Sequence, residues 1–75
     1  MRRQVLWNDS TIHSYAYDEE NHLLQIKYWE TGKVVNYHGV LPAIYVLVFE
    51  ESSAIGPEWE KYRKQFKFAA AEVKE

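Results

Sequence analysis

The fold is decided by residues 12–39, which read IHSYAYDEENHLLQIKYWETGKVVNYHG. Side chains in this stretch alternate between two sets with a period of two, which is typical of half-buried strands. The alternation is interrupted by the polar loop DEENH at 18–22 and by the turn ETG at 30–32, where Gly32 is able to adopt a positive φ. Two short loops that join three strands predict an antiparallel β-meander. Residues 4–7 are a candidate for one further short strand.

The middle strand of this meander has two chemically different faces. Leu24, Ile26 and Tyr28 alternate with Gln25, Lys27 and Trp29. The first set is expected to face the core, because none of its members carries a charge. The second set mixes an amide, a cation and an aromatic ring, so its face is expected to meet water. The sheet therefore has one face to bury, and helices must cover it.

The period changes after residue 41. Pro42 suits the first turn of a helix, where its missing N–H costs nothing. Ile44, Leu47 and Val48 follow at helical spacing, and the segment is apolar almost all the way round. Taken alone, residues 45–49 fit a strand equally well, but the preceding proline and the following glutamates favour a helix. This helix is expected to be the most buried element of the chain.

A second helix is predicted after Gly56. Pro57 suits its first turn, and Glu58 is favoured there by the helix macrodipole. The alanines at 69–71 are expected to propagate the helix, so that it occupies residues 57–75. The sequence therefore predicts an α+β fold, in which a three-stranded antiparallel β-meander is followed by two α-helices packed on one face.

Length and composition narrow the possible functions. The chain of 75 residues is expected to form one domain, residues 1–75. It contains no cysteine, which excludes disulfides, a thiolate nucleophile and any cysteine-bound metal. The start, MRRQVLW, lacks the apolar segment of a signal peptide, and no apolar run is long enough to span a membrane. The expected location is the cytoplasm, with no membrane contact.

Neither catalysis nor a metal site is predicted. No serine stands in a glycine elbow, and no set of residues fills the roles of nucleophile, base and oxyanion donor. His13 and His38 lie on strands that are expected to flank the middle one, so their imidazoles should not meet. His22 lies in an acidic loop without ligand spacing, which favours a solvated turn. We therefore expect a protein that is not an enzyme and that needs no cofactor.

Two groups of side chains are candidates for ligand binding. The aromatic candidates on the strands are Tyr15, Tyr17, Trp29 and Tyr37. Outward aromatic rings on a sheet can stack on bases, as in single-strand binders. The alternative, favoured for so small a domain, is that these rings fill the core or brace neighbours across the strands.

The second candidate group is cationic. Four positive charges within seven residues are contributed by Lys61, Arg63, Lys64 and Lys67. Positive charge that is clustered on one helix can contact phosphates, even though the formal net charge of the chain is −2. The alternative is an ordinary solvated helix face that Glu58 and Glu60 partly neutralise.

An ordered series of short motifs resembles the KTSC domain. The series is Ser10-Thr11-Ile12, Tyr17-Asp18, Leu24-x-Ile26-x-Tyr28, Gly32, Val35-x-Tyr37, Val40, Ile44-Tyr45 and Ser52-Ser53. This small family is named for the C-terminus of some lysyl-tRNA synthetases and also occurs as short bacterial and phage proteins. The resemblance covers residues 10–56, with Val35-Asn36-Tyr37 standing where the family has tyrosine-x-tyrosine. It implies a compact β-meander with helices and no established reaction, and its company with a tRNA-handling enzyme suggests RNA.

These observations together predict a noncatalytic binding module whose ligand is RNA or another phosphate-rich molecule. The alternative is a small protein-interaction module, such as a bacterial or phage regulator or inhibitor that docks on a larger protein, because many aromatic residues suit interface hot spots. A third prediction is homo-oligomerisation, because the segment at 40–49 is too apolar to be hidden fully within one protomer.

Overall fold

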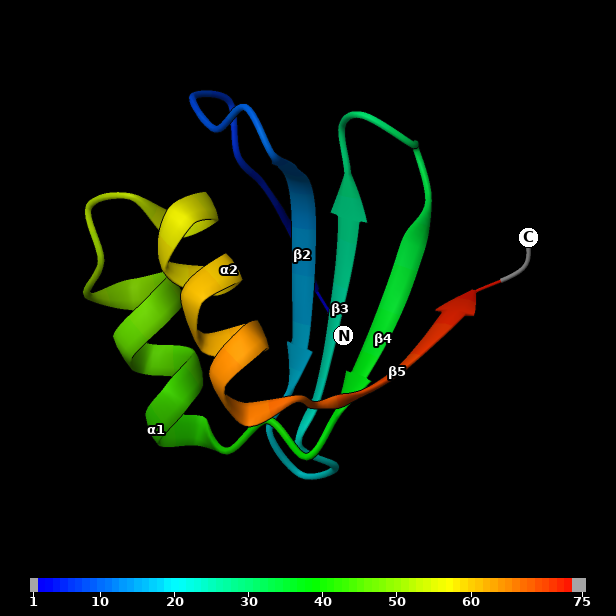
Figure 1. Ribbon diagram of the computed structural model, residues 1–75, viewed down its shortest axis with the longest axis vertical. Coiled ribbons are helices and arrows are strands. Elements are labelled where there is room, and N and C mark those ends of the chain that lie inside the picture. Colours follow the sequence, from blue (N-terminus) through cyan, green and yellow to red (C-terminus); the bar gives the residue numbers. More distant parts are fainter. Residues whose placement is uncertain (1, 74–75) are drawn as a thin grey trace.

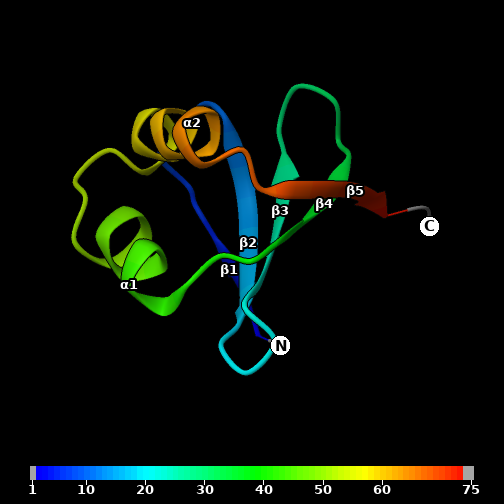
Figure 2. The ribbon, with the colours of Figure 1, turned by 60° about the horizontal axis from the view of Figure 1, so that its bottom comes forward.

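The computed structural model describes residues 2–73 and contains one antiparallel sheet with two helical segments (Figure 1). The elements are β1 (Arg3–Val5), β2 (Ile12–Asp18), β3 (Leu23–Tyr28), β4 (Val34–His38), α1 (Pro42–Tyr45), η1 (Val46–Glu50), α2 (Ile55–Phe66) and β5 (Ala69–Val73). The five strands lie in the order of the sequence, so each pairs with its neighbour in the chain. Both helical segments lie on the same side of the sheet in the two views of Figures 1 and 2. The predicted α+β class with an antiparallel sheet is confirmed.

The predicted meander corresponds to β2, β3 and β4. The first hairpin closes where the Asp18 carboxylate accepts hydrogen bonds from the backbone N–H and the side-chain amide of Asn21, at 3.3 and 2.8 Å. These bonds favour the ionised form and lower the pKa of Asp18. In the second hairpin Gly32 has a φ of +69°, as its position in the turn predicted.

The number of strands was underestimated, because the sheet has five strands rather than three. β1 overlaps the candidate strand at 4–7. β5 is formed by the residues that were expected to extend the second helix. That helix ends at Phe66, because Lys67 adopts left-handed angles (φ 49°, ψ 54°), and residues 69–73 then pair with β4. Alanine has a high helix propensity, but here the open edge of β4 offers partners for the backbone groups and outweighs it. Lys74 and Glu75 lie outside the described residues.

The helical segment at 42–50 is not the most buried element. α1 contributes no buried residue, and in η1 only Val48 and Phe49 are buried. Leu47 is half exposed. η1 is a turn of π-helix, closed by a hydrogen bond of 2.9 Å from the Glu51 N–H to the Val46 carbonyl. No helix among residues 2–73 combines the length and the apolar character that crossing a membrane requires.

The core lies between the helices and one face of the sheet. Its buried members are Ile12, Tyr15, Leu24, Ile26, Tyr37, Val40, Val48, Phe49 and Trp59. From Tyr15 onward, the strand residues of this set alternate with residues that point to the other face, as the period of two requires. We call the helix side the covered face and the opposite side, on which no described helix lies, the open face.

Candidate functional site

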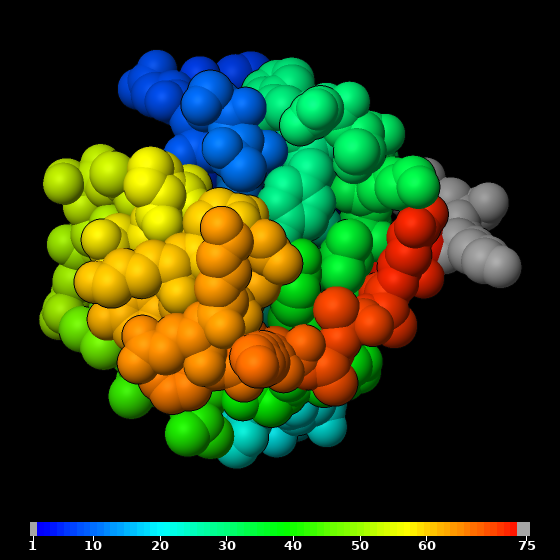
Figure 3. Space-filling model, viewed as in Figure 1, coloured from blue at the N-terminus to red at the C-terminus, as the bar shows by residue number. Residues whose placement is uncertain are grey.

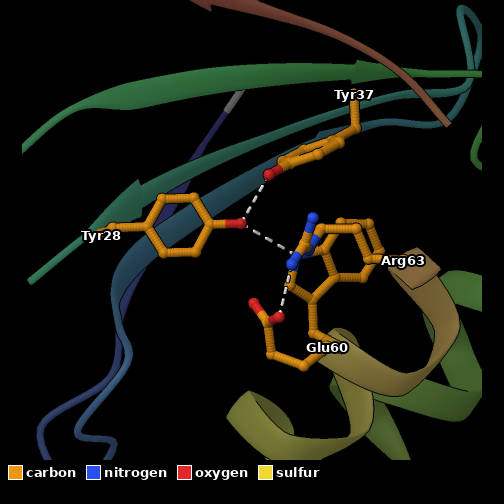
Figure 4. Close-up of polar contacts among 5 residues, drawn as sticks. Tyr28, Tyr37, Glu60 and Arg63 are labelled. Atoms are coloured by element: carbon orange, nitrogen blue, oxygen red, sulfur yellow. Dashed lines mark hydrogen bonds and ion pairs between the residues drawn. The ribbon is translucent and has the colours of Figure 1, made fainter. Parts of the chain in front are cut away.

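A group of polar contacts attaches α2 to the sheet on the covered face (Figure 4). The Tyr28 hydroxyl is hydrogen-bonded to the Tyr37 hydroxyl at 2.6 Å and accepts a hydrogen bond from the Trp59 indole N–H at 3.2 Å. Beside them, the Arg63 guanidinium donates to the Glu60 carboxylate at 2.6 Å. Burial and the bond to Tyr28 raise the pKa of Tyr37, and the bond to Glu60 raises the pKa of Arg63. The cluster orients α2. The hydroxyls of Tyr28 and Tyr37 are already hydrogen-bonded within it.

Three of the four aromatic candidates belong to the covered face. Tyr15 and Tyr37 are 7% and 6% exposed, and both are members of the core. Tyr17 is half-buried, donates a hydrogen bond of 2.6 Å to the Val40 carbonyl and stacks on Tyr45 with ring centroids 4.2 Å apart. Burial raises the pKa of Tyr15 and of Tyr17, and it raises that of Tyr45 to about 12. These three rings therefore pack in or against the core, as the alternative to base stacking predicted.

The cationic candidates occupy α2 and the residue after it, on the covered side of the sheet (Figure 3). Lys61, Lys64 and Lys67 are exposed, and no ion pair to them occurs within residues 2–73. The Lys61 ammonium lies 5.7 Å from the centroid of the Tyr62 ring. Arg63 differs from the lysines because it is paired with Glu60 and partly buried.

Trp29 is the one aromatic candidate that is exposed, at 46%. By the alternation of β3 it follows Gln25 and Lys27 on the open face, whereas α2 lies over the covered face. The structure therefore does not bring Trp29 together with the cations of α2. It places them on opposite sides of the sheet.

The open face carries a hydrogen-bonded polar row that the local sequence pattern does not reveal. The strand register aligns Arg3, Ala16, Gln25, Asn36 and Ala71 across all five strands. The Arg3 guanidinium donates to the side-chain oxygens of Ser14, at 3.1 Å, and of Gln25. The Gln25 amide then donates to the Asn36 side-chain oxygen at 3.0 Å. The outward position of Gln25 was predicted, but its partners come from strands whose register the sequence does not specify.

A second row on the open face contains Lys27. The register aligns Val5, Ser14, Lys27, Val34 and Val73. At the end of this row, β2 has an irregularity between Ile12 and Ser14, where a β-bulge admits one extra residue, His13. The His13 ring packs edge-on against Trp29, with ring centroids 4.4 Å apart. In these two rows the described residues include two cations and no carboxylate.

Two cavities open at the end of the sheet where the β1–β2 loop and the β3–β4 turn lie. One, of about 380 Å³, lies between α2 and the turn that joins β3 to β4, and its lining includes Tyr28, Lys33 and Glu60. The other, of about 470 Å³, lies between the β1–β2 loop and the loop before α2, and its lining includes Trp7 and Asp9. Trp7 is 82% exposed.

One pair of neighbouring side chains on the open face combines a hydroxyl with an imidazole. Ser14 Oγ lies 3.0 Å from His13 Nδ1, but Ser14 is fully buried beneath the side chains of the open face and cannot reach a substrate. Within residues 2–73, no three histidine or acidic side chains gather closely enough to hold a metal ion.

Comparison with known proteins links this arrangement to one family. The family model described as the KTSC domain matches residues 8–56. The crystal structure of a KTSC domain protein from Yersinia pestis is similar to this chain, with a TM-score of 0.82 and 27% identity over 97% of each chain. No curated protein matches significantly.

Proposed function

The chain belongs to the KTSC domain family, and from that premise we propose that it is a noncatalytic binding module for single-stranded RNA. One observation carries the proposal: an exposed tryptophan stands beside cations and amides on a sheet face that no described helix covers. Such a face can offer stacking, phosphate pairing and hydrogen bonds to the same ligand. We expect the protein to bind this RNA in the cytoplasm.

Trp29 supplies the stacking surface. Its ring is 46% exposed, and its edge-on contact with His13 limits the orientations that the indole can take. Stacking of a base on an aromatic side chain contributes about 1–3 kcal/mol and tolerates any base. A base is accessible for this contact only where it is unpaired, so the site should prefer single strands to duplexes.

Arg3 and Lys27 supply the positive charge on the same face. Arg3 is exposed and uses only part of its donor fork on Ser14 and Gln25. Two phosphate contacts to a single strand predict a slope of about −1.4 in a plot of the logarithm of affinity against that of salt concentration. The amides of Gln25 and Asn36 follow Arg3 along one row of this face and offer hydrogen bonds to base edges.

The test is a titration of fluorescently labelled oligouridine, followed by anisotropy at several salt concentrations. We expect Trp29→Ala to weaken binding roughly fivefold to a hundredfold, from the stacking energy of one base. Trp7→Ala is the matched control, because Trp7 is also exposed but lies in another loop, and it should leave the affinity unchanged. Lys27→Gln should make the salt slope shallower by about 0.7.

The triple variant Lys61→Gln, Lys64→Gln and Lys67→Gln tests the cationic surface of α2 as the place of phosphate contact. If this variant abolishes binding while Trp29→Ala and Lys27→Gln do not weaken it, the RNA site lies on α2 instead. If no oligouridine binds at low salt, RNA is not the ligand.

Docking on a larger protein is the second candidate function. The observation that favours it is a set of large apolar side chains that are exposed by 47–82%: Trp7, Leu41, Leu47 and Phe66. Sedimentation analysis distinguishes a protein partner from self-association, which was predicted for the segment at 40–49. A pull-down after nuclease treatment that yields one stoichiometric protein would support docking, and recovery of no protein would count against it.

A further inference from the structure

We propose that the free edge of β1 binds an extended peptide segment of a partner protein, which places one aliphatic side chain in the cavity beside Trp7. This inference concerns the backbone edge of β1 and a protein ligand, whereas the RNA proposal concerns side chains of the open face, so either can fail without the other. It rests on three features of one corner of the molecule: an unpaired strand edge, a cavity of about 470 Å³ that lies beyond this edge beside the exposed Trp7, and the charge of that cavity.

The first feature is the edge itself. β1 is the first strand of the sheet, and within residues 2–73 no strand pairs with its other side. The Leu6 N–H points toward β2, where it donates to the His13 carbonyl at 2.9 Å. Because backbone groups alternate in direction along a strand, the N–H and C=O groups of Arg3 and Val5 point to the free edge. Alternating donors and acceptors of this kind are satisfied best by another extended chain.

The second feature is the position of the cavity directly beyond this edge. The chain runs from Val5 into Leu6 and Trp7, and all three residues line the cavity. Ile55 and Pro57 close it from the side of α2. A peptide paired with Val5 would therefore carry its next side chains past the apolar part of this lining, where one of them can be buried. Trp7, at 82% exposed, would lose most of its contact with water when that happens.

The third feature is the charge of the cavity, which selects the kind of ligand. Asp9 is the ionisable residue in the lining, and its carboxylate already accepts hydrogen bonds from three backbone N–H groups. Those bonds come from Thr11 at 2.9 Å, Ile12 at 2.6 Å and Gly56 at 3.0 Å. No lysine or arginine is among the described residues of the lining. The cavity therefore does not attract a phosphate. Its serines and Asn8 are uncharged, and an aliphatic side chain can pack on the apolar part that Leu6, Trp7 and Ile55 form.

A second copy of this chain is a poorer occupant of the same edge. Antiparallel pairing of two β1 strands would bring Arg2 and Arg3 of both copies close to one another. Like charges on paired strands destabilise the pair. A partner segment without arginine at these positions avoids that repulsion.

The experiment is an NMR titration of the isotope-labelled chain with a blocked peptide of alternating threonine and valine that carries one leucine at the cavity position. We expect shift changes confined to β1, Trp7 and Ile55. A peptide with aspartate in place of leucine should bind at least about tenfold more weakly, because a buried leucine side chain is replaced by a charge. N-methylation of the peptide amides that face β1 should abolish pairing.

Two protein variants separate the edge from the cavity. Val5→Pro removes one outward N–H without touching the bonds to β2, and it should weaken the peptide roughly fivefold; Val5→Ala, its matched control, keeps that N–H. Trp7→Ala should weaken the leucine peptide but not the aspartate peptide. The proposal is overturned if the leucine and aspartate peptides bind equally, if N-methylation has no effect, or if sedimentation shows that a second copy already occupies the edge. Oligouridine should not shift the signals of Trp7 and Ile55, whether or not RNA binds the open face.

Discussion

The two faces of the sheet are built on the same strands but serve different purposes. On the covered face, Leu24, Ile26 and Tyr37 are buried against the helices. On the open face, the residues between them include Gln25, Lys27 and Asn36, which are half-buried and either hydrogen-bonded or charged. The period of two allows one backbone to carry a core on one side and a polar surface on the other. Stability should therefore depend on the covered face and ligand binding on the open one.

The strongest test of this division compares two tryptophans. Trp59→Ala should destabilise the protein by about 3–5 kcal/mol, because Trp59 is fully buried in the core and its loss leaves a cavity. Trp29→Ala on the open face should cost no more than about 1 kcal/mol, because the ring is 46% exposed. Urea denaturation measures both free energies of unfolding. Equal losses would show that the open face is as important to stability as the core.

The next effect is a loss of stability at alkaline pH. Burial raises the pKa of Tyr45 to about 12, and it also raises the pKa of Tyr37. The unfolded chain ionises first, near pH 10, so the folded form binds more protons between pH 10 and 12. The protonated phenols therefore make their full contribution to the free energy of unfolding below about pH 10. This contribution is lost as the pH rises through 12. Tyr45→Phe should reduce this loss, and urea midpoints at increasing pH measure it.

A smaller effect is expected from the polar cluster of the covered face. Tyr28→Phe removes the hydroxyl that meets Trp59 and Tyr37, which leaves buried polar groups unpaired and should cost about 1–3 kcal/mol. The open-face change Gln25→Ala breaks bonds to Arg3 and Asn36, but water can replace them, so it should cost less than about 1 kcal/mol. Thermal unfolding of both variants compares the two polar groups. A larger loss of stability for Gln25→Ala than for Tyr28→Phe would contradict the division of roles between the two faces.

The smallest effect concerns the junction between α2 and β5. Lys67 has a φ of +49°, which glycine adopts without strain, so Lys67→Gly should stabilise the protein by up to about 1 kcal/mol. Lys67→Val should destabilise it, because a β-branched residue disfavours this conformation. The free energy of unfolding in urea distinguishes these outcomes. Stabilisation by valine would indicate that the helix continues into residues 69–73, as local propensity predicts.

The central part of the fold was predictable from local pattern. The hydrophobic alternation and the two loops identified β2, β3 and β4, and the ordered motifs identified the KTSC family. The open face of β3 was also predictable, because Gln25, Lys27 and Trp29 stand at alternate positions. Each of these inferences needs only information within a few residues of the position concerned.

The candidate site was predictable only in part. Exposed Trp29 and the exposed lysines of α2 were identified, but Tyr15 and Tyr37 were placed among the ligand candidates although both lie in the core. A period of two shows which residues of one strand share a face, but it does not show which residues of the neighbouring strand lie on that same face. The bulge at His13 shifts the alternation along β2 and conceals that answer from the sequence.

The sequence alone therefore determined the antiparallel meander, the helical segments and the family, because turns, periodicity and motifs are local properties. Tertiary structure decided that the alanines of β5 become a strand, because the open edge of β4 supplies hydrogen-bond partners that a helix propensity of a few tenths of a kcal/mol cannot match. It likewise decided that Trp29 and the α2 lysines lie on opposite sides, because only the packing of the helices against the sheet divides covered residues from open ones.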